Sequence, residues 1–167
     1  MHNSLVFTYD SVEALTLNED CNYILNVPMF YEFDNYSNDR VDFVFDTGAY
    51  ITVITKRDAA FLGFTNSYII QSGVPLSGFI GGCMVDIMNI PGMIIGGRHL
   101  EGVKVAVPQV DTDTNILGLN VLETFKYLID TENDLIFFAQ NPLPNIPELL
   151  RCGKIRSISY GAKNGVK

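Results

Sequence analysis

Tryptophan is absent from this 167-residue chain, and histidine and cysteine are scarce. With only two histidines, His2 and His99, the sequence argues against a histidine-based metal site or a serine–histidine–aspartate triad. We expect His99 to be a solvated turn residue. The three cysteines, Cys21, Cys83 and Cys152, lie far apart and are odd in number, so they indicate neither a disulfide framework nor a zinc site. No phosphate-binding loop or dinucleotide-binding pattern is present, so the sequence predicts no cofactor and no metal.

Long apolar runs are also missing. Asp, Asn, Lys or Gly interrupts every apolar stretch before it reaches the length of a membrane span, so we expect no contact with a membrane. Residues 1–7 contain no basic cluster, and Asp10 and Glu13 follow them. This pattern argues against a secretory signal and predicts a cytoplasmic protein.

Basic residues are few outside the C-terminal end. The chain has 11 Lys and Arg against 19 Asp and Glu, for a formal net charge of −8. Residues 151–167 hold five of the basic residues and no acidic one, so the rest of the chain is strongly acidic. An acidic body argues against nucleic acid as a partner.

The composition that remains is 47% hydrophobic and 18% charged, which is typical of a globular protein with a sizeable core. Short apolar runs separated by Gly, Pro, Asn and Asp recur along the chain and predict an all-β protein. We expect strands over residues 5–8, 23–33, 41–46, 51–55, 68–71, 74–80, 83–89, 93–96, 103–107, 127–130 and 135–139, and short helices over 56–62 and 119–125.

The most informative segment is an apolar strand, residues 41–45, that ends in Asp46-Thr47-Gly48-Ala49. A carboxylate at the end of such a strand, held by a tight Thr-Gly turn, is suited to activating water for attack on a peptide bond. The tripeptide alone is weak evidence, because it should occur by chance in roughly a few per cent of chains this long. Its context makes it specific.

Three further features follow in chain order: a short helix that ends at Gly63, a glycine-rich hairpin tip at residues 78–82, and an apolar-apolar-glycine element at residues 116–118. With these features, residues 41–139 resemble the retropepsin-like (retroviral-type) single-lobe aspartic proteases. The Ala at the fourth motif position is the retroviral form. The resemblance implies an acid-protease-type β-barrel, closed or partly open, with a flap hairpin and one or two short helices, assembled as a twofold homodimer.

The resemblance also implies roles for individual residues. Asp46 would be catalytic, in an active-site loop with Thr47, Gly48 and Ala49. The flap over the substrate would comprise Gly78, Phe79, Ile80, Gly81 and Gly82. The loop packed beside the site would comprise Ile116, Leu117 and Gly118.

This chemistry needs a second carboxylate, because two carboxylates about 3 Å apart share one proton and so supply an acid and a base. Within the chain, Asp130 is followed by Thr and Glu rather than Thr and Gly, and its surroundings indicate a polar hairpin turn. Asp111 and Asp113 are typical of a solvated loop. The remaining option is a homodimer in which Asp46 of each subunit meets its copy across the axis.

The sequence therefore predicts an aspartic endopeptidase that binds a peptide or protein substrate as an extended strand. Two alternatives stay open: a catalytically silent dimerisation or peptide-binding module of the same fold, and an unrelated β-barrel. We expect an N-terminal extension over residues 1–40, with one or two strands that join the main sheet, and a catalytic domain over 41–140. Residues 141–167, Pro-rich and then basic, would be a mobile tail or an ordered arm at a subunit contact.

Overall fold

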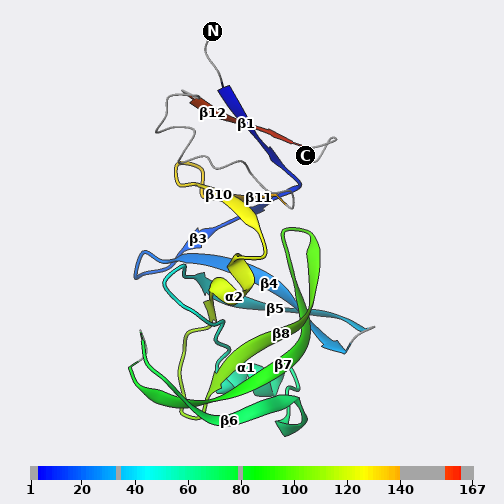
Figure 1. The fold of residues 1–167 in the computed structure, drawn as a ribbon, viewed down its shortest axis with the longest axis vertical. Coiled ribbons are helices and arrows are strands. Elements are labelled where there is room, and N and C mark those ends of the chain that lie inside the picture. Colours follow the sequence, from blue (N-terminus) through cyan, green and yellow to red (C-terminus); the bar gives the residue numbers. More distant parts are fainter. Residues whose placement is uncertain (1–3, 33–34, 79–80, 140–156, 163–167) are drawn as a thin grey trace. The chain divides into compact units, whose positions relative to one another are not determined.

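A computed structural model gives the fold and describes residues 4–32, 35–78, 81–139 and 157–162 (Figure 1). These residues form β-strands for the most part, with two short α-helices and one 3-10 helix, η1 (Asn66–Tyr68). The prediction of an all-β protein with one or two short helices is confirmed. The chain divides into a larger unit, Leu15–Thr124, and a smaller unit made of Met1–Ala14 and Phe125–Lys167. Across the described ranges, neither unit contains a helix with the length and apolar character needed to cross a membrane.

One sheet organises the larger unit. Its described strands follow the order β6, β7, β4, β5, β9, with β3 beside β4 and β8 beside β7. Their bounds are β3 (Thr16–Leu17), β4 (Tyr23–Glu32), β5 (Asn35–Phe45), β6 (Ile69–Leu76), β7 (Cys83–Ile95), β8 (Arg98–Pro108) and β9 (Ile116–Leu117). The pairs are antiparallel except that of β5 with β9, which is parallel.

Alternation of side chains along β4 and β5 builds the core beneath the sheet. Leu25 and Val27 on β4 and Phe43 on β5 are buried, as expected for every second residue of a half-buried strand. The exposed residues Asn26 and Asp42 lie between buried positions of the two strands, and Asn26 Nδ2 donates to Asp42 Oδ1 at 2.7 Å. β5, the strand that leads to the Asp-Thr-Gly segment, is therefore held in place by buried apolar side chains on one face and by a side-chain hydrogen bond to β4 on the other.

Two long strands replace four predicted ones. The strands predicted over 83–89 and 93–96 form the single strand β7, which ends one residue earlier, at Ile95. The strands predicted over 68–71 and 74–80 correspond to the single strand β6, whose register is irregular between Gln71 and Val74 and which ends at Leu76. β7 stays continuous because β8 pairs with it along most of its length. The hairpin between β7 and β8 turns at Gly96 and Gly97, whose φ angles of 60° and 71° are those of a two-residue type I′ turn.

The predicted strand over residues 51–55 is wrong. In this fully described segment Val53 alone forms β-bridges, antiparallel to Ile116 and parallel to Ala106. The N–H of Ile54 donates to the carbonyl oxygen of Ala106 on β8, but the N–H groups of Thr52 and Thr55 donate to asparagine side chains from elsewhere in the chain. The apolar alternation in the sequence is real, but asparagine side chains take the place of a partner strand at Thr52 and Thr55, and strand-like backbone bonding is confined to the residues around Val53.

Both helices lie near their predicted positions. α1 (Lys56–Phe61) begins after Thr55, whose Oγ1 accepts the N–H of Asp58 at 3.1 Å, and the chain leaves it through Gly63 at a φ of 76°. α2 (Leu119–Leu122) is shorter than predicted. Only Gly118 separates it from β9, and its first N–H groups donate to carbonyl oxygens of the loop that carries the Asp-Thr-Gly segment.

His99 is exposed, as expected, but it lies at the start of β8 and not in the turn before it. Its ring stacks on Phe30 with the centroids 3.9 Å apart. A Cβ at Gly92 would lie 2.8 Å from His99 Nε2 and closer still to the carbonyl oxygen of Leu100. Gly92 therefore provides the space in which the imidazole lies.

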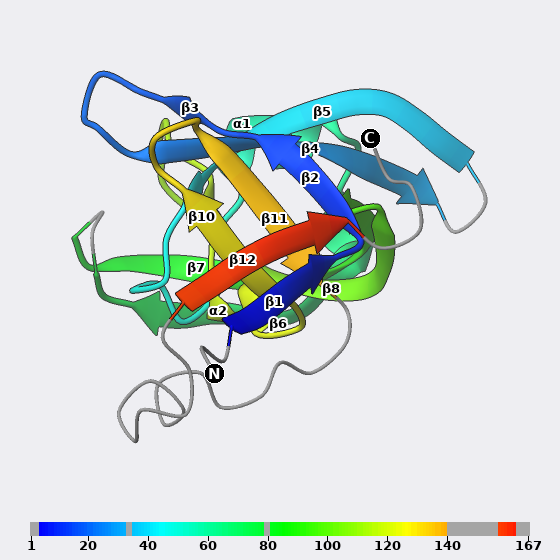
Figure 2. The ribbon, with the colours of Figure 1, turned by 90° about the horizontal axis from the view of Figure 1, so that it is seen from above.

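The smaller unit contains β1 (Ser4–Tyr9), β2 (Ser11–Ala14), β10 (Lys126–Asp130), β11 (Leu135–Ala139) and β12 (Ser157–Ala162). β11 pairs antiparallel with β10 and β2, and β12 runs parallel to β1 (Figure 2). β12 falls in the stretch expected to be a tail, whereas the Pro-rich residues 141–147 lie outside the described residues. The domain boundaries after residues 40 and 140 remain predictions.

Asp130 ends β10 and organises the turn to β11. Its Oδ1 accepts the backbone N–H groups of Glu132 and Asn133 at 3.0 and 3.1 Å, and its Oδ2 accepts Asn133 Nδ2 at 2.8 Å. These bonds, first of all the one from the Asn133 side chain, hold the pKa of Asp130 below its usual value. The interpretation of Asp130 as part of a polar hairpin turn is confirmed.

Candidate active site

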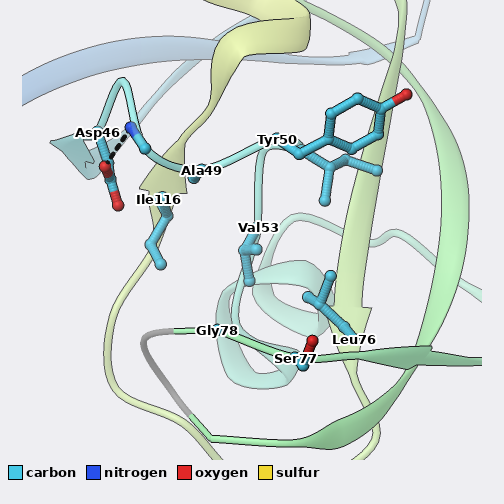
Figure 3. A pocket seen from close by; sticks show the side chains of 10 residues that line it. Asp46, Ala49, Tyr50, Val53, Leu76, Ser77, Gly78 and Ile116 are labelled. Carbon is cyan, nitrogen blue, oxygen red and sulfur yellow. Dashed lines mark hydrogen bonds between the residues drawn. The ribbon is translucent and has the colours of Figure 1, made fainter.

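Asp46 directly follows the last residue of β5, and its backbone N–H donates to the carbonyl oxygen of Leu117 on β9 at 3.1 Å. Its side chain turns back onto its own loop, where Oδ1 accepts the N–H of Gly48 at 2.8 Å (Figure 3). This is an Asx turn, a local arrangement that short carboxylate side chains favour. A Cβ at Gly48 would lie 3.1 Å from that oxygen, so the glycine keeps the space beside the carboxylate open.

The first N–H groups of α2 hold the far end of the same loop. The N–H of Leu119 donates to the carbonyl oxygen of Ala49 at 2.8 Å, and the N–H of Asn120 donates to that of Tyr50 at 3.3 Å. Helix N-terminal N–H groups have no partner within the helix, so the loop and α2 satisfy each other. The loop that carries Asp46 is thus fixed at both ends.

Gly118 marks the closest approach between this loop and the element beside it. A Cβ at Gly118 would lie 2.6 Å from the carbonyl carbon and 2.7 Å from the carbonyl oxygen of Ile51. Two backbones can pass this closely only where one of them has no side chain. The predicted neighbours Ile116, Leu117 and Gly118 do lie against the Asp-Thr-Gly segment, since Ile116 and Leu117 pair with the end of β5.

Two asparagines bracket this element, and reasoning from sequence did not single them out. Asn120 Oδ1 accepts both the N–H and the Oγ1–H of Thr52, at 2.8 and 2.9 Å, while its Nδ2 donates to the carbonyl oxygen of Lys104 at 2.8 Å. Thr52 Oγ1 in turn accepts the N–H of Gly118 at 3.0 Å. The side chain of one asparagine thereby joins three separate segments of the larger unit.

Asn115 does the same on the other side. It is 7% exposed, and its Oδ1 accepts the N–H of Thr55 at 2.8 Å. Its Nδ2 donates to Asp58 Oδ2 at 2.7 Å and to the carbonyl oxygen of Asp42 at 3.2 Å. The only sequence signal for either role is an amide side chain immediately before or shortly after an apolar-apolar-glycine element.

A cavity of about 290 Å³ opens beside Asp46. The residues that line it are Asp46, Gly48, Ala49, Tyr50, Ile51, Val53, Leu76, Ser77, Gly78 and Ile116. Figure 3 shows the loop residues on one side and, on the other, Leu76 at the end of β6 with Ser77 and Gly78 after it. Asp46 is the one charged residue among these lining residues, so the cavity presents a single carboxylate against mostly apolar walls.

The predicted flap is described in part. Gly78 lines the cavity, and its carbonyl oxygen accepts the N–H of Gly81 at 2.9 Å. Gly81 and Gly82 are exposed, while Phe79 and Ile80 lie outside the described residues. The role of residues 78–82 as a flap stays a prediction.

Tyr50 is the most exposed of the large apolar side chains in the described chain, at 83%. It lies at the opposite end of the loop from Asp46 in Figure 3. Thr47 is also exposed, next to the carboxylate. The cavity is therefore bordered by an aromatic ring at one end and by the acid at the other.

The other acidic residues considered have different surroundings. Asp111 and Asp113 are exposed in the segment between β8 and β9, which confirms the solvated loop. Among the described residues, no three His, Cys, Asp or Glu side chains lie together in a way that could hold a metal ion.

A family model described as gag-polyprotein putative aspartyl protease matches residues 35–124. The chain belongs to this retropepsin-like family. It is similar to the crystal structure of a retropepsin-like aspartic protease from Rickettsia conorii, with 25% identity and a TM-score of 0.55 over 77% of this chain and 89% of that one. It is also similar to EIAV protease complexed with the inhibitor HBY-793, with 20% identity and a TM-score of 0.47 over 65% of this chain and 91% of that one. No curated protein matches the chain.

The family and the fold predicted from the Asp-Thr-Gly-Ala segment are confirmed by these matches. The matched residues 35–124 include the cavity, the Asp46 loop and the Ile-Leu-Gly element of this retropepsin-like chain. Of the two predicted forms of barrel, the closed one is not found, since the described strands do not close on themselves.

Proposed function

We propose that this retropepsin-like protein is an aspartic endopeptidase that hydrolyses peptide bonds with a water molecule held between the Asp46 carboxylates of two copies. The observation that carries the proposal is the position of Asp46. Its carboxylate is fixed by the Gly48 N–H at the edge of a largely apolar cavity, and Oδ2 has no hydrogen-bond partner within the part of the chain that the structure describes. A carboxylate oxygen directed away from its own loop is available to a water or to a second carboxylate.

The need for a second acid supports a dimer. Among the residues that line the cavity, Asp46 is the one acid, and Asp130 is engaged in its own turn. A twofold axis beside Asp46 would supply an identical carboxylate without a second motif in the chain. Two carboxylates about 3 Å apart do not both ionise, so the pair would hold one proton between them.

The reaction then uses this shared proton. The ionised carboxylate takes a proton from the water as its oxygen attacks the peptide carbonyl carbon, and the protonated carboxylic acid gives its proton to the carbonyl oxygen. Collapse of the tetrahedral intermediate breaks the carbon–nitrogen bond. The leaving amine takes a proton from the acid that was formed in the first step, and a hydroxyl group of the intermediate gives its proton to the other carboxylate as the product carboxyl group forms. The pair then again holds one proton, as at the start.

The substrate of this reaction would be an extended stretch of peptide. The cavity walls near the acid are formed by Ala49, Val53, Leu76 and Ile116, which favour an uncharged, apolar side chain beside the scissile bond. Thr47 would contribute to contacts between the two loops at the axis, and residues 78–82 would cover the peptide as a flap. An extended substrate could also pair its backbone with the strand edge of β6.

Cleavage of a mixed peptide library by the wild type and by Asp46→Asn tests the proposal, over about pH 4 to 7, where a carboxylate pair should titrate. The variant keeps the size of the side chain and can still accept the Gly48 N–H. We expect cleavage by the wild type and loss of at least about a thousand-fold in the variant, because general acid–base catalysis is removed. Equal cleavage by both proteins would exclude Asp46 as the catalytic acid and point to a contaminating protease or another site.

A further inference from the structure

Strands β6, β7 and β8 lie side by side in the sheet, but only β6 and β7 continue to the part that borders the cavity. β8 ends at Pro108, opposite Val85 of β7. The two residues of β7 that precede Val85 pair with Pro75 and Leu76 of β6, and no described strand lies on their other side. The end of the β6–β7 hairpin, which brings Leu76 to the cavity, is therefore supported along one edge by its own partner strand and not by β8.

A β-bulge lies at this transition. Gln71 is opposite Ile87 and Val74 is opposite Val85, so that Ser72 and Gly73 together face the single residue Asp86. Gly73 has a φ of 67°, a conformation that glycine adopts without strain. A bulge bends its strand, and this one sets the direction in which the last residues of β6 leave the sheet.

The carboxylate of Asp86 binds both residues of the bulge. Its Oδ1 accepts Ser72 Oγ–H at 2.6 Å and the N–H of Gly73 at 3.1 Å. The same oxygen accepts Gln109 Nε2–H at 2.9 Å, from the residue that follows β8. The backbone N–H of Gln109 also donates to the carbonyl oxygen of Met84 at 2.9 Å. One carboxylate thus ties the bulge in β6 to the end of β8 across the strand between them.

These hydrogen bonds favour the ionised carboxylate. The side chains of Ser72 and then Gln109 hold the pKa of Asp86 below its usual value, against a smaller opposing effect of burial. Donors that converge on a charged oxygen form stronger bonds than neutral pairs do. Burial of apolar area does not explain the arrangement, because Ser72 and Gln109 are exposed.

We propose that Asp86 is a positioning residue, which fixes the bulge at Ser72 and Gly73 and thereby holds the cavity-lining end of the hairpin over Asp46. The bulge precedes Leu76, Ser77 and Gly78 by a few residues, and these three line the cavity opposite the acid. Loss of the carboxylate releases the bend and displaces these residues relative to Asp46. The consequence for substrate rests on the proposed peptidase function, whereas the consequence for the hairpin does not.

Amide hydrogen exchange on the full chain tests the structural part. We compare the wild type with Asp86→Ala, with Ser72→Ala and Gln109→Ala, which each remove one donor, and with Asp111→Ala as a control in an exposed loop. In Asp86→Ala, we expect exchange at the amides of Val74, Leu76, Cys83 and Met84 to be about ten-fold faster, as the loss of charge-assisted hydrogen bonds implies, with β4 and β5 unchanged. Smaller increases at the same amides are expected for the two donor variants, and none for the control. Unchanged exchange at these amides, or equal acceleration throughout the larger unit, would overturn the proposal.

Peptide cleavage kinetics test the functional part. Weakened positioning of residues that bind the peptide raises KM more than it lowers kcat, so we expect Asp86→Ala to raise KM about ten-fold with kcat within about two-fold. Asp86→Asn keeps an oxygen that can accept the same donors, and it should recover part of the loss. A KM equal to that of the wild type, together with faster exchange in the hairpin, would contradict the positioning role. If the wild type cleaves no peptide, the proposed function fails, while the exchange result still decides whether Asp86 fixes the bulge.

Discussion

The amide nitrogen of Gly48 lies 2.8 Å from Oδ1 of Asp46, and a methyl group at Gly48 would place its carbon 3.1 Å from the same oxygen. The residue that donates to the carboxylate therefore also has to leave room for it. A separation of 3.1 Å is tighter than ordinary van der Waals contact, so the carboxylate would have to shift by a few tenths of an ångström.

Gly48→Ala should therefore reduce catalysis without unfolding the chain. We expect kcat/KM for a cleaved peptide to fall about ten- to a hundred-fold, because small displacements of a reacting group are costly. Thermal unfolding should change little, since the loop is at the surface. Steady-state kinetics and a melting curve check both parts, and full activity in the variant would show that the position of the Asp46 carboxylate does not depend on Gly48.

Gly118→Ala should act on stability instead. Its Cβ would overlap backbone atoms of Ile51, which cannot move aside as a flexible side chain could. We expect a loss of about 1–3 kcal/mol in the free energy of unfolding, the range for overpacked interiors. Gly82→Ala is the matched control, because nothing lies within 4 Å of a Cβ at that position. In urea titrations, Gly118→Ala should unfold at a clearly lower urea concentration than Gly82→Ala. Equal midpoints would contradict the prediction, because they would mean that the backbone at Gly118 accommodates a methyl group without loss of stability.

The two asparagines beside β9 should not be equivalent. Thr52 and Thr55 are both buried, but Asn115 is buried as well, whereas Asn120 is exposed. Asn115→Ala therefore leaves the N–H of Thr55 without an acceptor, while in Asn120→Ala water can take the place of the amide oxygen beside Thr52. Loss of a buried partner costs about 1–3 kcal/mol. We expect Asn115→Ala to be the more destabilising of the two in denaturant unfolding. The reverse order would show that the link from Asn120 through Thr52 to Gly118 is the stronger support.

Asp86 should give the fold a pH-dependent contribution. Its pKa is lowered in the folded chain by the Ser72 and Gln109 hydrogen bonds, so ionised Asp86 stabilises the fold at pH values above the unfolded pKa of about 4. This contribution is lost as pH falls through the lower pKa of the folded state. The difference in free energy of unfolding between the wild type and Asp86→Asn should therefore be present near neutral pH and shrink below about pH 4. Asp111→Asn, measured over the same range, should show no such trend, and a pH-independent difference for Asp86→Asn would contradict the prediction.

The features that sequence predicted correctly depend on residues close together in the chain. The Asp46 loop combines a strand end, a turn and a local Asx hydrogen bond within three positions. The turn at Asp130 is likewise made by bonds to the next few residues. Both could be predicted because their partners are adjacent.

The features that sequence missed depend on distant partners. The N–H groups of Thr52 and Thr55 donate to asparagine side chains more than fifty residues further along, and the local sequence, which looks like a strand, carries no sign of these partners. β9 has only two residues, and it exists because it pairs with the end of β5. The role of Asp86 is equally invisible in sequence. Its partners are Ser72, in the bulge of β6, and Gln109, the residue that follows β8, and both are distant from Asp86 in the chain.

The central claim, a site shared between two copies, is tested most directly by mixing subunits. Inactive Asp46→Asn chains are added to a fixed amount of wild type, under conditions that allow exchange, and cleavage per wild-type chain is measured. If both copies must supply Asp46, activity per wild-type chain falls to about one half at an equal amount of variant and to about one tenth at a nine-fold excess, because pairing is random in a closed twofold dimer. Activity that stays constant at every ratio would contradict the shared site and assign catalysis to a single chain.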